Sequence, residues 1–525
     1  MARQSLVYHP DGLDPCNVAN IQPHLYQAFG NIDLLPWISL SYTLSGFAVL
    51  SLSRKVTYCF SLRWIYIVCL AIFLAGAAIG GSASSMSVVV VGRIIMGVGG
   101  AIVYQSNLTF ISVHASPAQS PRLVAALSGA WAVGLIVGGP IGAALAENPH
   151  TTWRWAFYLN LPFMGLALLI SILCFPSTYI GPDIPLTSRL LQADPVGIAL
   201  NMATPVLFSV ALEFSGPVWA WNSGPAIAVW VLFGAMLLAW IVQQVLCLGT
   251  TPERRAIPLH LFARLDLIPL WITSGCAGAT YAITLYYIPL FLAFARGLDA
   301  MQQTVHTLPF ILTFITTVVI VGGILPIPTV GRNYPFFYIF AGAAITAAAA
   351  GLASSTLDAS TPDSHILGLT ALIGIGLGAS FQHAVGICNT LNKTTHDRVD
   401  CATFLLLAQS GAIAISLSMA GCVLQNVGEA RLSDALRGVP GLSRDEIRQA
   451  LAGASSVLRD SGELSPEQLA SAVDAVSGVF ATEFWLVVAA GVMCLLCGLA
   501  MLAGGIRGKG ESVRDGEVRG EEESV

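Results

Sequence analysis

Long, unbroken runs of apolar residues recur along almost the whole chain, with short polar segments between them. A helix needs about 20 mostly apolar residues to cross the roughly 30 Å of hydrocarbon in a bilayer. Because the runs are continuous rather than alternating, they predict membrane-spanning helices and not a β-barrel. The thirteen runs lie near residues 33–52, 63–81, 86–108, 122–146, 153–175, 195–214, 224–248, 267–294, 304–325, 335–354, 364–388, 399–424 and 480–505.

Two segments depart from this pattern. Residues 427–479 contain a possible capping box, Ser443 to Glu446, and a second helix start, Ser465 to Gln468. They predict two or three short amphipathic helices outside the membrane, and two interpretations stay open, a cap over the external mouth or a spacer. Residues 506–525 are charged and rich in glycine, so they predict a disordered tail.

The composition supports a membrane protein. Of 525 residues, 55% are hydrophobic and 10% are charged, whereas soluble proteins carry about 25% charged residues. A net charge of −5 excludes a nucleic-acid partner recognised by bulk charge. The lipid bilayer is therefore the expected surrounding, and no cysteine, histidine or acidic cluster predicts a metal site or another cofactor.

Basic residues in the short loops set the orientation. Eleven lie in or beside the first set of alternate loops, namely Arg54, Lys55, Arg63, Arg122, Arg189, Arg254, Arg255, Arg264, Arg332, Lys393 and Arg398. The other set of short loops holds only Arg154 and Arg296. The first set and the C-terminal tail are therefore expected in the cytosol, and the 427–479 segment on the opposite side.

Several motifs resemble one known family. They are Gly92-Arg93-Ile-Ile-Met-Gly97-Val-Gly99-Gly100-Ala101, Gly134-Leu-Ile-Val-Gly138-Gly139-Pro140-Ile-Gly142, Trp153-Arg154-Trp155-Ala156-Phe157-Tyr158-Leu159-Asn160-Leu161-Pro162, Leu13-Asp14, Ile21-Gln22-Pro23, Tyr287-Ile-Pro289 and Arg296-Gly297. Together they are similar to the major facilitator superfamily, in its fourteen-span drug:H⁺ antiporter branch of fungal multidrug and secondary-metabolite exporters. The resemblance extends over about residues 12–505.

The resemblance implies an all-α carrier with two six-helix bundles that rock about a midplane site, and two further spans inserted between them. The expected domains are a segment 1–32 with a remnant of the first span, an N-terminal bundle 33–175, inserted spans 176–248, a C-terminal bundle 249–426, the external segment 427–479, the last span 480–505 and the tail 506–525. That gives about thirteen complete spans.

The same resemblance implies roles for individual residues. Arg93, an expensive charge inside a span, matches the family's proton-coupling arginine, and Asp14 matches its acidic partner. The glycines and proline of Gly97, Gly134, Gly138, Gly139, Pro140 and Gly142 match motifs at which helices slide and pivot. The sequence departs from the family in its short first span and in its gating loop, which is reduced to Ser53-Arg54-Lys55 without the usual aspartate.

Polar and aromatic residues on the apolar runs are candidates for a substrate cavity. They are Gln105, Trp131, Asn160, Tyr281, Gln382 and His383. Helix–helix hydrogen bonding is the competing interpretation for each of them. Glu213 and Asp266 lie near span ends and are expected at the membrane interface.

The leading hypothesis is a monomeric, proton-coupled exporter of small organic compounds such as drugs, toxins or secondary metabolites. The plasma membrane is the expected location, with the vacuolar membrane as the alternative. Two other functions stay open: import of a siderophore or nutrient, and a degenerate carrier that does not transport. The sequence shows no motif for an enzyme or a nucleotide-driven pump.

Overall fold

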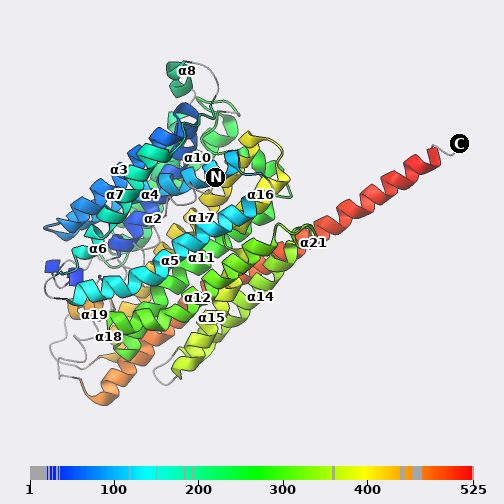
Figure 1. Ribbon diagram of the computed structural model, residues 1–525. Coiled ribbons are helices and arrows are strands. Elements are labelled where there is room, and N and C mark those ends of the chain that lie inside the picture. Colours follow the sequence, from blue (N-terminus) through cyan, green and yellow to red (C-terminus); the bar gives the residue numbers. More distant parts are fainter. Residues whose placement is uncertain are drawn as a thin grey trace.

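The computed structural model describes residues 21, 24–26, 28–30, 34, 36–116, 119–148, 151–181, 185–191, 194–252, 254–357, 361–437, 444–451 and 464–522, and the side chains of the last helix as far as residue 504. Within these ranges, long helices packed along a common direction form the molecule (Figure 1). Twelve helices are long and apolar enough to cross a membrane. The remaining predicted run, the first one near residues 33–52, forms α2 (Trp37–Cys59), a helix of 23 residues that also carries Arg54 and Lys55.

The N-terminal bundle contains α2, α3 (Leu62–Gly81), α4 (Met86–His114), α5 (Ser120–Glu147), α6 (Trp155–Tyr158) and α7 (Asn160–Cys174). Its tightest pairs are α3 with α4 and α2 with α4. Ile21 and Leu25, which precede α2, are completely buried in the core of this bundle. The sequence before α2 therefore contributes helical residues to the same bundle.

Two helices follow the first bundle, α9 (Pro195–Phe214) and α10 (Gly224–Leu246), after the short α8 (Leu186–Leu191). They pack on each other, and α9 also contacts α2 and α17 (Thr395–Val423). The most hydrophobic stretch of α10 is almost wholly exposed. The inserted pair thus lies beside the junction of the two bundles, with α10 outermost.

The C-terminal bundle contains α11 (Ile268–Phe291), α12 (Ala300–Ile324), α14 (Pro335–Gly351), α15 (Asp363–Ser380), α16 (His383–Leu391), α17 and α21 (Pro466–Glu522). Short elements η3 (Leu259–Ala263), η4 (Leu292–Arg296), α13 (Pro328–Gly331), η5 (Leu352–Thr356), η6 (Leu424–Gly428), α18 (Glu429–Ala435) and α19 (Arg444–Leu451) lie between or extend these helices. The bundles meet where α5 packs on α12 and where α2 packs on α17.

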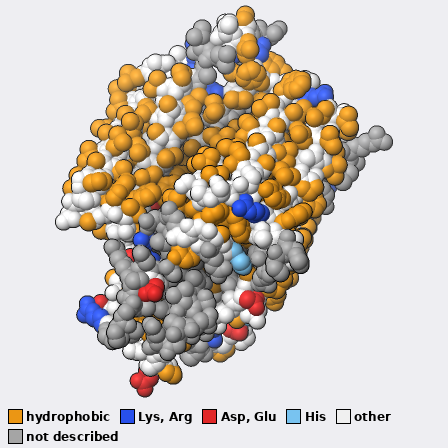
Figure 2. Space-filling model, turned by 90° about the vertical axis from the view of Figure 1, so that its left-hand side faces the viewer, with side chains coloured by type: hydrophobic (Ala, Val, Ile, Leu, Met, Phe, Trp, Pro, Cys, Tyr) orange, Lys and Arg blue, Asp and Glu red, His pale blue; other side chains and the backbone are white. Residues whose placement is uncertain are grey.

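The surface matches a lipid environment. Hydrophobic side chains cover the flank of the molecule, and charged side chains gather near its ends (Figure 2). Large hydrophobic residues such as Trp64, Leu173 and Val231 are exposed. Exposed apolar surface of this extent is stable only against lipid or another protein, so the chain is a multi-pass membrane protein.

Three boundaries differ from the sequence prediction. The first run continues as helix to Cys59, because Arg54 and Lys55 are buried against partners and need no loop. The helix expected at Ser465 does begin there, with Gln468 completing a capping box, but it continues without a break into the last span. Helical backbone also extends through the predicted disordered tail to Glu522, since no proline interrupts it.

Candidate functional site

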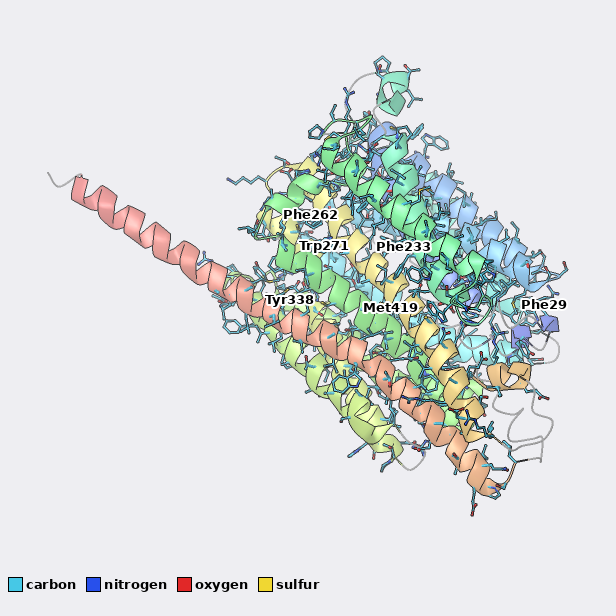
Figure 3. All side chains as sticks on the ribbon, turned by 180° about the vertical axis from the view of Figure 1, so that it is seen from behind. Phe29, Phe233, Phe262, Trp271, Tyr338 and Met419 are labelled. Atoms are coloured by element: carbon cyan, nitrogen blue, oxygen red, sulfur yellow. The ribbon has the colours of Figure 1, made fainter. Side chains whose placement is uncertain are left out.

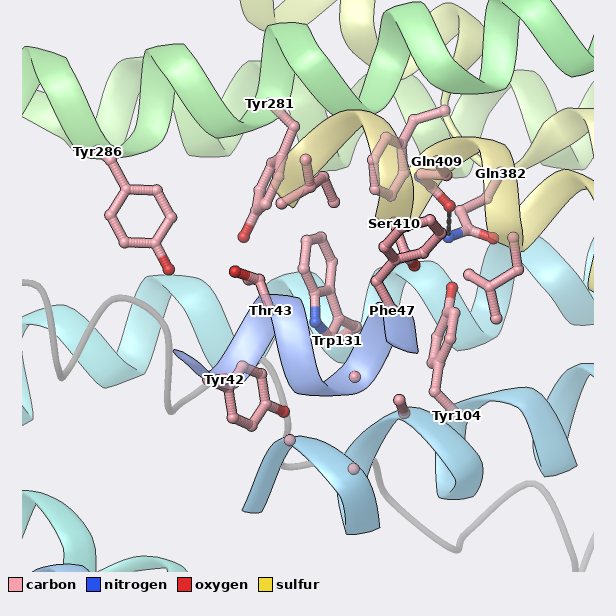
Figure 4. A pocket seen from close by; sticks show the side chains of 17 residues that line it. Tyr42, Thr43, Phe47, Tyr104, Trp131, Tyr281, Tyr286, Gln382, Gln409 and Ser410 are labelled. Atoms are coloured by element: carbon pink, nitrogen blue, oxygen red, sulfur yellow. Dashed lines mark hydrogen bonds between the residues drawn. The ribbon is translucent and has the colours of Figure 1, made fainter. Parts of the chain in front are cut away.

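A cavity of about 150 Å³ lies between the two bundles. Aromatic and small residues of α2, α4, α5, α11 and α17 form most of its wall (Figure 4). The lining residues are Tyr42, Thr43, Gly46, Phe47, Gly97, Gly100, Ala101, Tyr104, Trp131, Tyr281, Tyr286, Phe381, Gln382, Leu406, Gln409, Ser410 and Ile413. Both bundles contribute to the wall, so any movement between them changes its shape.

Trp131 of α5 is the centre of an aromatic cluster that joins the bundles. Its ring stacks on Phe381 with centroids 5.7 Å apart, and its centroid lies 5.2 Å from that of Tyr281 on α11. The ring of Phe314 on α12 meets Trp131 edge-on at 6.3 Å. Such arrangements add attraction beyond the buried area. The cluster presents flat, apolar faces to a ligand.

Two glutamine amides provide the fixed polar group of the cavity. Gln382 Nε2 donates to Gln409 Oε1 at 2.9 Å (Figure 4). Gln382 has a left-handed backbone, with φ of 64°, and interrupts the helix between α15 and α16. Residues in this region are held there only by their surroundings, and carriers place broken helices at their binding sites. The pair leaves Gln382 Oε1 as an acceptor and Gln409 Nε2 as a donor for a ligand.

Among the described residues, none that lines the cavity is charged. The side chains in contact with the cavity are aromatic, aliphatic, hydroxyl or amide groups. An ion placed here would lose its hydration without gaining a counter-charge, and that cost is large in an apolar environment. The cavity therefore favours uncharged ligands.

Arg93 lies immediately behind this wall. It is completely buried on α4, its Nε donates to the carbonyl of Ile38 at 2.9 Å, and its guanidinium lies 4.4 Å from the ring centroid of Tyr42. Tyr42 lines the cavity. The charge of Arg93 is thus one aromatic ring away from a ligand. Asp14 lies outside the described residues, so its approach to Arg93 stays a prediction.

Glycines let α4 approach α2 beside the cavity. A Cβ atom on Gly97 would overlap the carbonyl oxygen of Tyr42 and the hydroxyl of Ser45. Gly46 on α2 faces Gly97 and Ala101 from the other side. The helices therefore pack backbone to backbone at this level, as small residues allow in membrane proteins.

The glycine-proline motif lies on α5, at the junction of the bundles. Its buried glycines are Gly134, Gly138, Gly139 and Gly142. A Cβ atom on Gly139 would come within 2.7 Å of Thr304 Cγ2 on α12. Helix α5 continues through Pro140, which lacks the N–H that would close its turn. The close approach of α5 to α12 and the weakened turn at Pro140 lie at the same place, as expected where two helices slide past each other. The role of this motif as a pivot stays a prediction.

Three of the six residues predicted for the cavity line it: Trp131, Tyr281 and Gln382. The other three are buried elsewhere in helix contacts. Gln105 donates to Thr403 Oγ1 on α17 at 2.8 Å, Asn160 donates to the carbonyl of Ala156, and a ring nitrogen of His383 lies 3.0 Å from the carbonyl of Gly378. Helix–helix or local hydrogen bonding accounts for those three.

The sequence did not reveal a buried ion pair that joins the bundles near one end of the cavity. Arg54 of α2 donates from Nε and Nη2 to the two carboxylate oxygens of Asp400 on α17, at 2.8 and 2.6 Å. Tyr58 donates to Asp400 Oδ1 at 3.0 Å, and Lys55 donates to the carbonyl of Arg254 at 2.7 Å. This end is the one that the basic loops assign to the cytosol. In the sequence, the only indication of this ion pair is the isolated basic pair Arg54-Lys55 at the end of an apolar run.

The comparisons with known proteins agree with this architecture. The model of the Major Facilitator Superfamily matches residues 16–419. The efflux pump DEP3 of Fusarium langsethiae is 32% identical over 444 residues, which cover 85% of this chain and 79% of that protein. The phomenoic acid biosynthesis cluster MFS-type transporter of Leptosphaeria maculans is 29% identical, covering 93% and 78%.

Among solved structures, a bacterial homolog of the human lysosomal transporter Spinster aligns with a TM-score of 0.61 and 12% identity, over 96% of this chain and 97% of that chain. This likeness shows the fold. Two helical bundles around a shared central cavity define the class of secondary membrane carriers. The chain belongs to the major facilitator superfamily.

Proposed function

We propose that this protein is a monomeric, proton-coupled exporter of small, uncharged organic molecules with flat apolar surfaces. The observation that carries the proposal is the described part of the cavity wall, in which aromatic rings from both bundles surround one amide pair and no side chain is charged. A secondary metabolite of aromatic or polyunsaturated character would bury its apolar area on the rings. One carbonyl or hydroxyl would bond to Gln382 or Gln409.

The names of the relatives support the outward direction. One is an efflux pump, and another belongs to a biosynthesis cluster for a fungal metabolite. Export of a metabolite from the cell requires the plasma membrane, with storage in the vacuole as the alternative. Import of a nutrient or siderophore is less favoured, because many such compounds are charged and the cavity offers no counter-charge.

The position of Arg93 supports proton coupling. A change in the charge around Arg93 alters its attraction to the ring of Tyr42, and Tyr42 contacts the ligand space. Protonation of an acid near Arg93 would therefore change the contact between Arg93 and Tyr42, and through Tyr42 the wall of the cavity. Asp14 is the acid that we propose for this role.

The experiment uses the full chain in inside-out proteoliposomes with an imposed pH gradient. Uptake is compared for neutral, cationic and anionic aromatic compounds of similar size. The neutral compounds should accumulate, and Trp131→Ala should weaken their binding by about 1–3 kcal/mol, the contribution of one buried aromatic side chain. The matched control is Trp64→Ala, since Trp64 lies on the lipid-facing surface with 62% of its side chain exposed.

Each alternative predicts a different result. Preferential accumulation of charged compounds would contradict the proposed substrate class. Accumulation driven in the opposite direction would indicate an importer. A correctly folded protein that neither binds nor moves any compound would indicate a degenerate carrier.

A further inference from the structure

Besides Asp400, two acidic residues are buried on candidate membrane spans and do not line the cavity. Glu483 of α21 is 1% exposed and Glu213 of α9 is 5% exposed. Glu213 lies one residue before the end of α9, near a span end as the sequence predicted, and it is buried there because α17 and Gln425 of η6 pack on it. Buried acids in membrane helices are rare and are commonly functional.

Glu483 has no hydrogen-bond partner among the described residues, for either carboxylate oxygen. It lies on the side of α21 that packs against α11, where the rings of Phe480 and Phe291 meet at 5.9 Å. Phe484, the next residue, is completely buried in the same apolar core. A charged carboxylate without donors is very costly in such a core, whereas a neutral carboxylic acid is tolerated.

Among the described residues, Glu213 has one hydrogen-bond partner, and a glycine leaves room for its carboxyl group. Gln425 Nε2, in the π-helical element η6, donates to Glu213 Oε2 at 2.9 Å. A Cβ atom on Gly421 would come within 2.5 Å of Glu213 Oε1, so the glycine makes room for the carboxyl group. Such π-helical turns occur frequently at functional sites.

Tyr287 of α11 lies in the neighbourhood of both acids. Its hydroxyl donates to the carbonyl of Leu417 on α17 at 3.5 Å. One and two turns earlier on the same face of α11, the buried hydroxyls of Thr284 and Thr280 have no partner among the described residues. These groups form a polar row that begins beside the cavity residue Tyr281 and ends at the acids. Figure 3 shows the three helices concerned, α11, α17 and α21, from behind.

We propose that Glu483 and Glu213 are two proton-binding groups at the junction of α9, α11, α17 and α21, separate from Arg93. Binding adds one proton to a carboxylate oxygen and removes one negative charge, and release to the other side restores that charge. The unpartnered hydroxyls of α11 supply positions along which a proton, carried with water, passes between the cavity and the acids. The role in transport rests on the proposed function, whereas proton binding does not.

Other titratable or charged groups face this region from the surrounding elements. Cys422 of α17 lies within electrostatic reach of Glu213. The charged residues of the short elements packed on α21 are Arg296 in η4 and Glu429, Arg431 and Asp434 in α18. Arg296 and Glu429 already have ionic neighbours in Asp363 and Arg448. A Cβ atom on Gly478, more than one turn before Glu483, would come within 3.1 Å of Arg431 Nη1.

The first test measures protonation directly. Infrared difference spectra of the full protein in lipid, recorded as a function of pH, should contain a carboxylic acid carbonyl band that disappears as pH rises. The band should be lost in Glu483→Gln, altered in Glu213→Gln and unchanged in Asp434→Asn, because Asp434 lies on the surface in an ion pair with Arg437. A band that stays constant at all pH values, or that survives in Glu483→Gln, would refute the site.

The second test measures transport in proteoliposomes. Glu483→Gln should retain exchange of substrate between the two sides, which needs no net proton movement, and should lose accumulation driven by a pH gradient. Accumulation at the wild-type level in this variant would overturn the role in coupling. If the wild type shows the titrating band but no gradient-driven transport, the proposed function fails and the proton site stands.

Discussion

Arg54 and Asp400 form a two-pronged ion pair between the bundles, with N–O distances of 2.8 and 2.6 Å, although 346 residues separate them in the chain. Arg54 is 4% exposed and Asp400 is completely buried. Arg54 Nη1 also donates to the carbonyl of Arg255, in the segment that follows the inserted helices. One guanidinium therefore ties the N-terminal bundle to the C-terminal bundle and to that segment.

Removal of one partner from this ion pair should separate α2 from α17 at this end of the molecule. Asp400→Asn leaves the guanidinium of Arg54 buried without a counter-charge, which costs about 3–5 kcal/mol for buried pairs. The two bundles should separate there, and backbone amides of residues 54–59 and 395–400 should exchange hydrogen for deuterium faster. Exchange rates measured on the full protein in lipid check this outcome.

A double variant distinguishes a gate from a simple loss of stability. Arg54→Gln together with Asp400→Asn removes both charges, so the variant should be less impaired than Asp400→Asn alone. The matched control is Asp266→Asn, because the pair of Arg264 and Asp266 is exposed and such pairs contribute about 1 kcal/mol or less. Equal effects of the single and double variants would show that the ion pair does not hold the bundles together.

The membrane helices could be predicted from the sequence because each needs its own long apolar run, and that information is local. The end of α2 could not, because Arg54 and Lys55 lie at the boundary of an apolar run and look like loop residues. Their burial depends on Asp400 and on the carbonyl of Arg254, both far away in the chain. Contacts at this separation leave no local pattern.

The cavity was only partly predictable for a related reason. Trp131 and Gln382 are unusual within apolar runs, so they attract attention as ligand contacts. Tyr104 and Phe381 also line the cavity, but an aromatic residue in a membrane helix has the same pattern whether it faces a ligand, lipid or another helix. Gln105 and His383 were equally unusual, and their polarity serves hydrogen bonds within the fold.

Arg93→Ala should abolish coupled export and leave substrate binding in place. Without the guanidinium, the neutral form of a nearby acid is favoured, and an acid that stays protonated cannot release its proton. Arg93→Lys keeps the charge without the planar group that stacks on Tyr42, so its export should be intermediate. Export against an imposed pH gradient and equilibrium binding of the same compound are measured together. Parallel loss of both would indicate a purely structural arginine.

Gly97→Ala should destabilise the N-terminal bundle beside the cavity. The added methyl group would overlap the backbone of Tyr42 on α2, which is unable to move as a flexible side chain would. Overpacking of this kind costs about 1–3 kcal/mol, and it should lower the melting temperature and the transport rate. The matched control is Gly165→Ala in α7, where a Cβ atom meets nothing within 4 Å. A melting temperature unchanged in Gly97→Ala would mean that α2 and α4 are free to separate.

Asp194 holds together the segments next to the ion pair of Arg54 and Asp400. It is buried at the start of α9 with a left-handed backbone, φ 54°. Its Oδ1 accepts from the backbone N–H of Gly197 at 3.0 Å and from Gln243 Nε2 at 2.9 Å, and its Oδ2 accepts from the N–H of Ala256 at 2.9 Å. The carbonyl of Arg255, the residue before Ala256, accepts from Arg54.

Asp194→Asn should therefore loosen the segment before Ala256 while α9 stays folded. Asparagine tolerates the left-handed backbone and keeps the acceptor for Gly197, but its amide nitrogen would face the N–H of Ala256. Loss of this charged hydrogen bond costs about 1.5–3 kcal/mol.

Cys247 reports the change, because its sulfur accepts from Arg255 Nε and Nη2 at 3.2 and 2.8 Å and becomes accessible when Arg255 moves. A thiol reagent should label Cys247 faster in Asp194→Asn, with Cys247→Ser identifying the labelled site by mass spectrometry. An unchanged labelling rate would show that the inserted helices do not hold this segment in contact with Arg54.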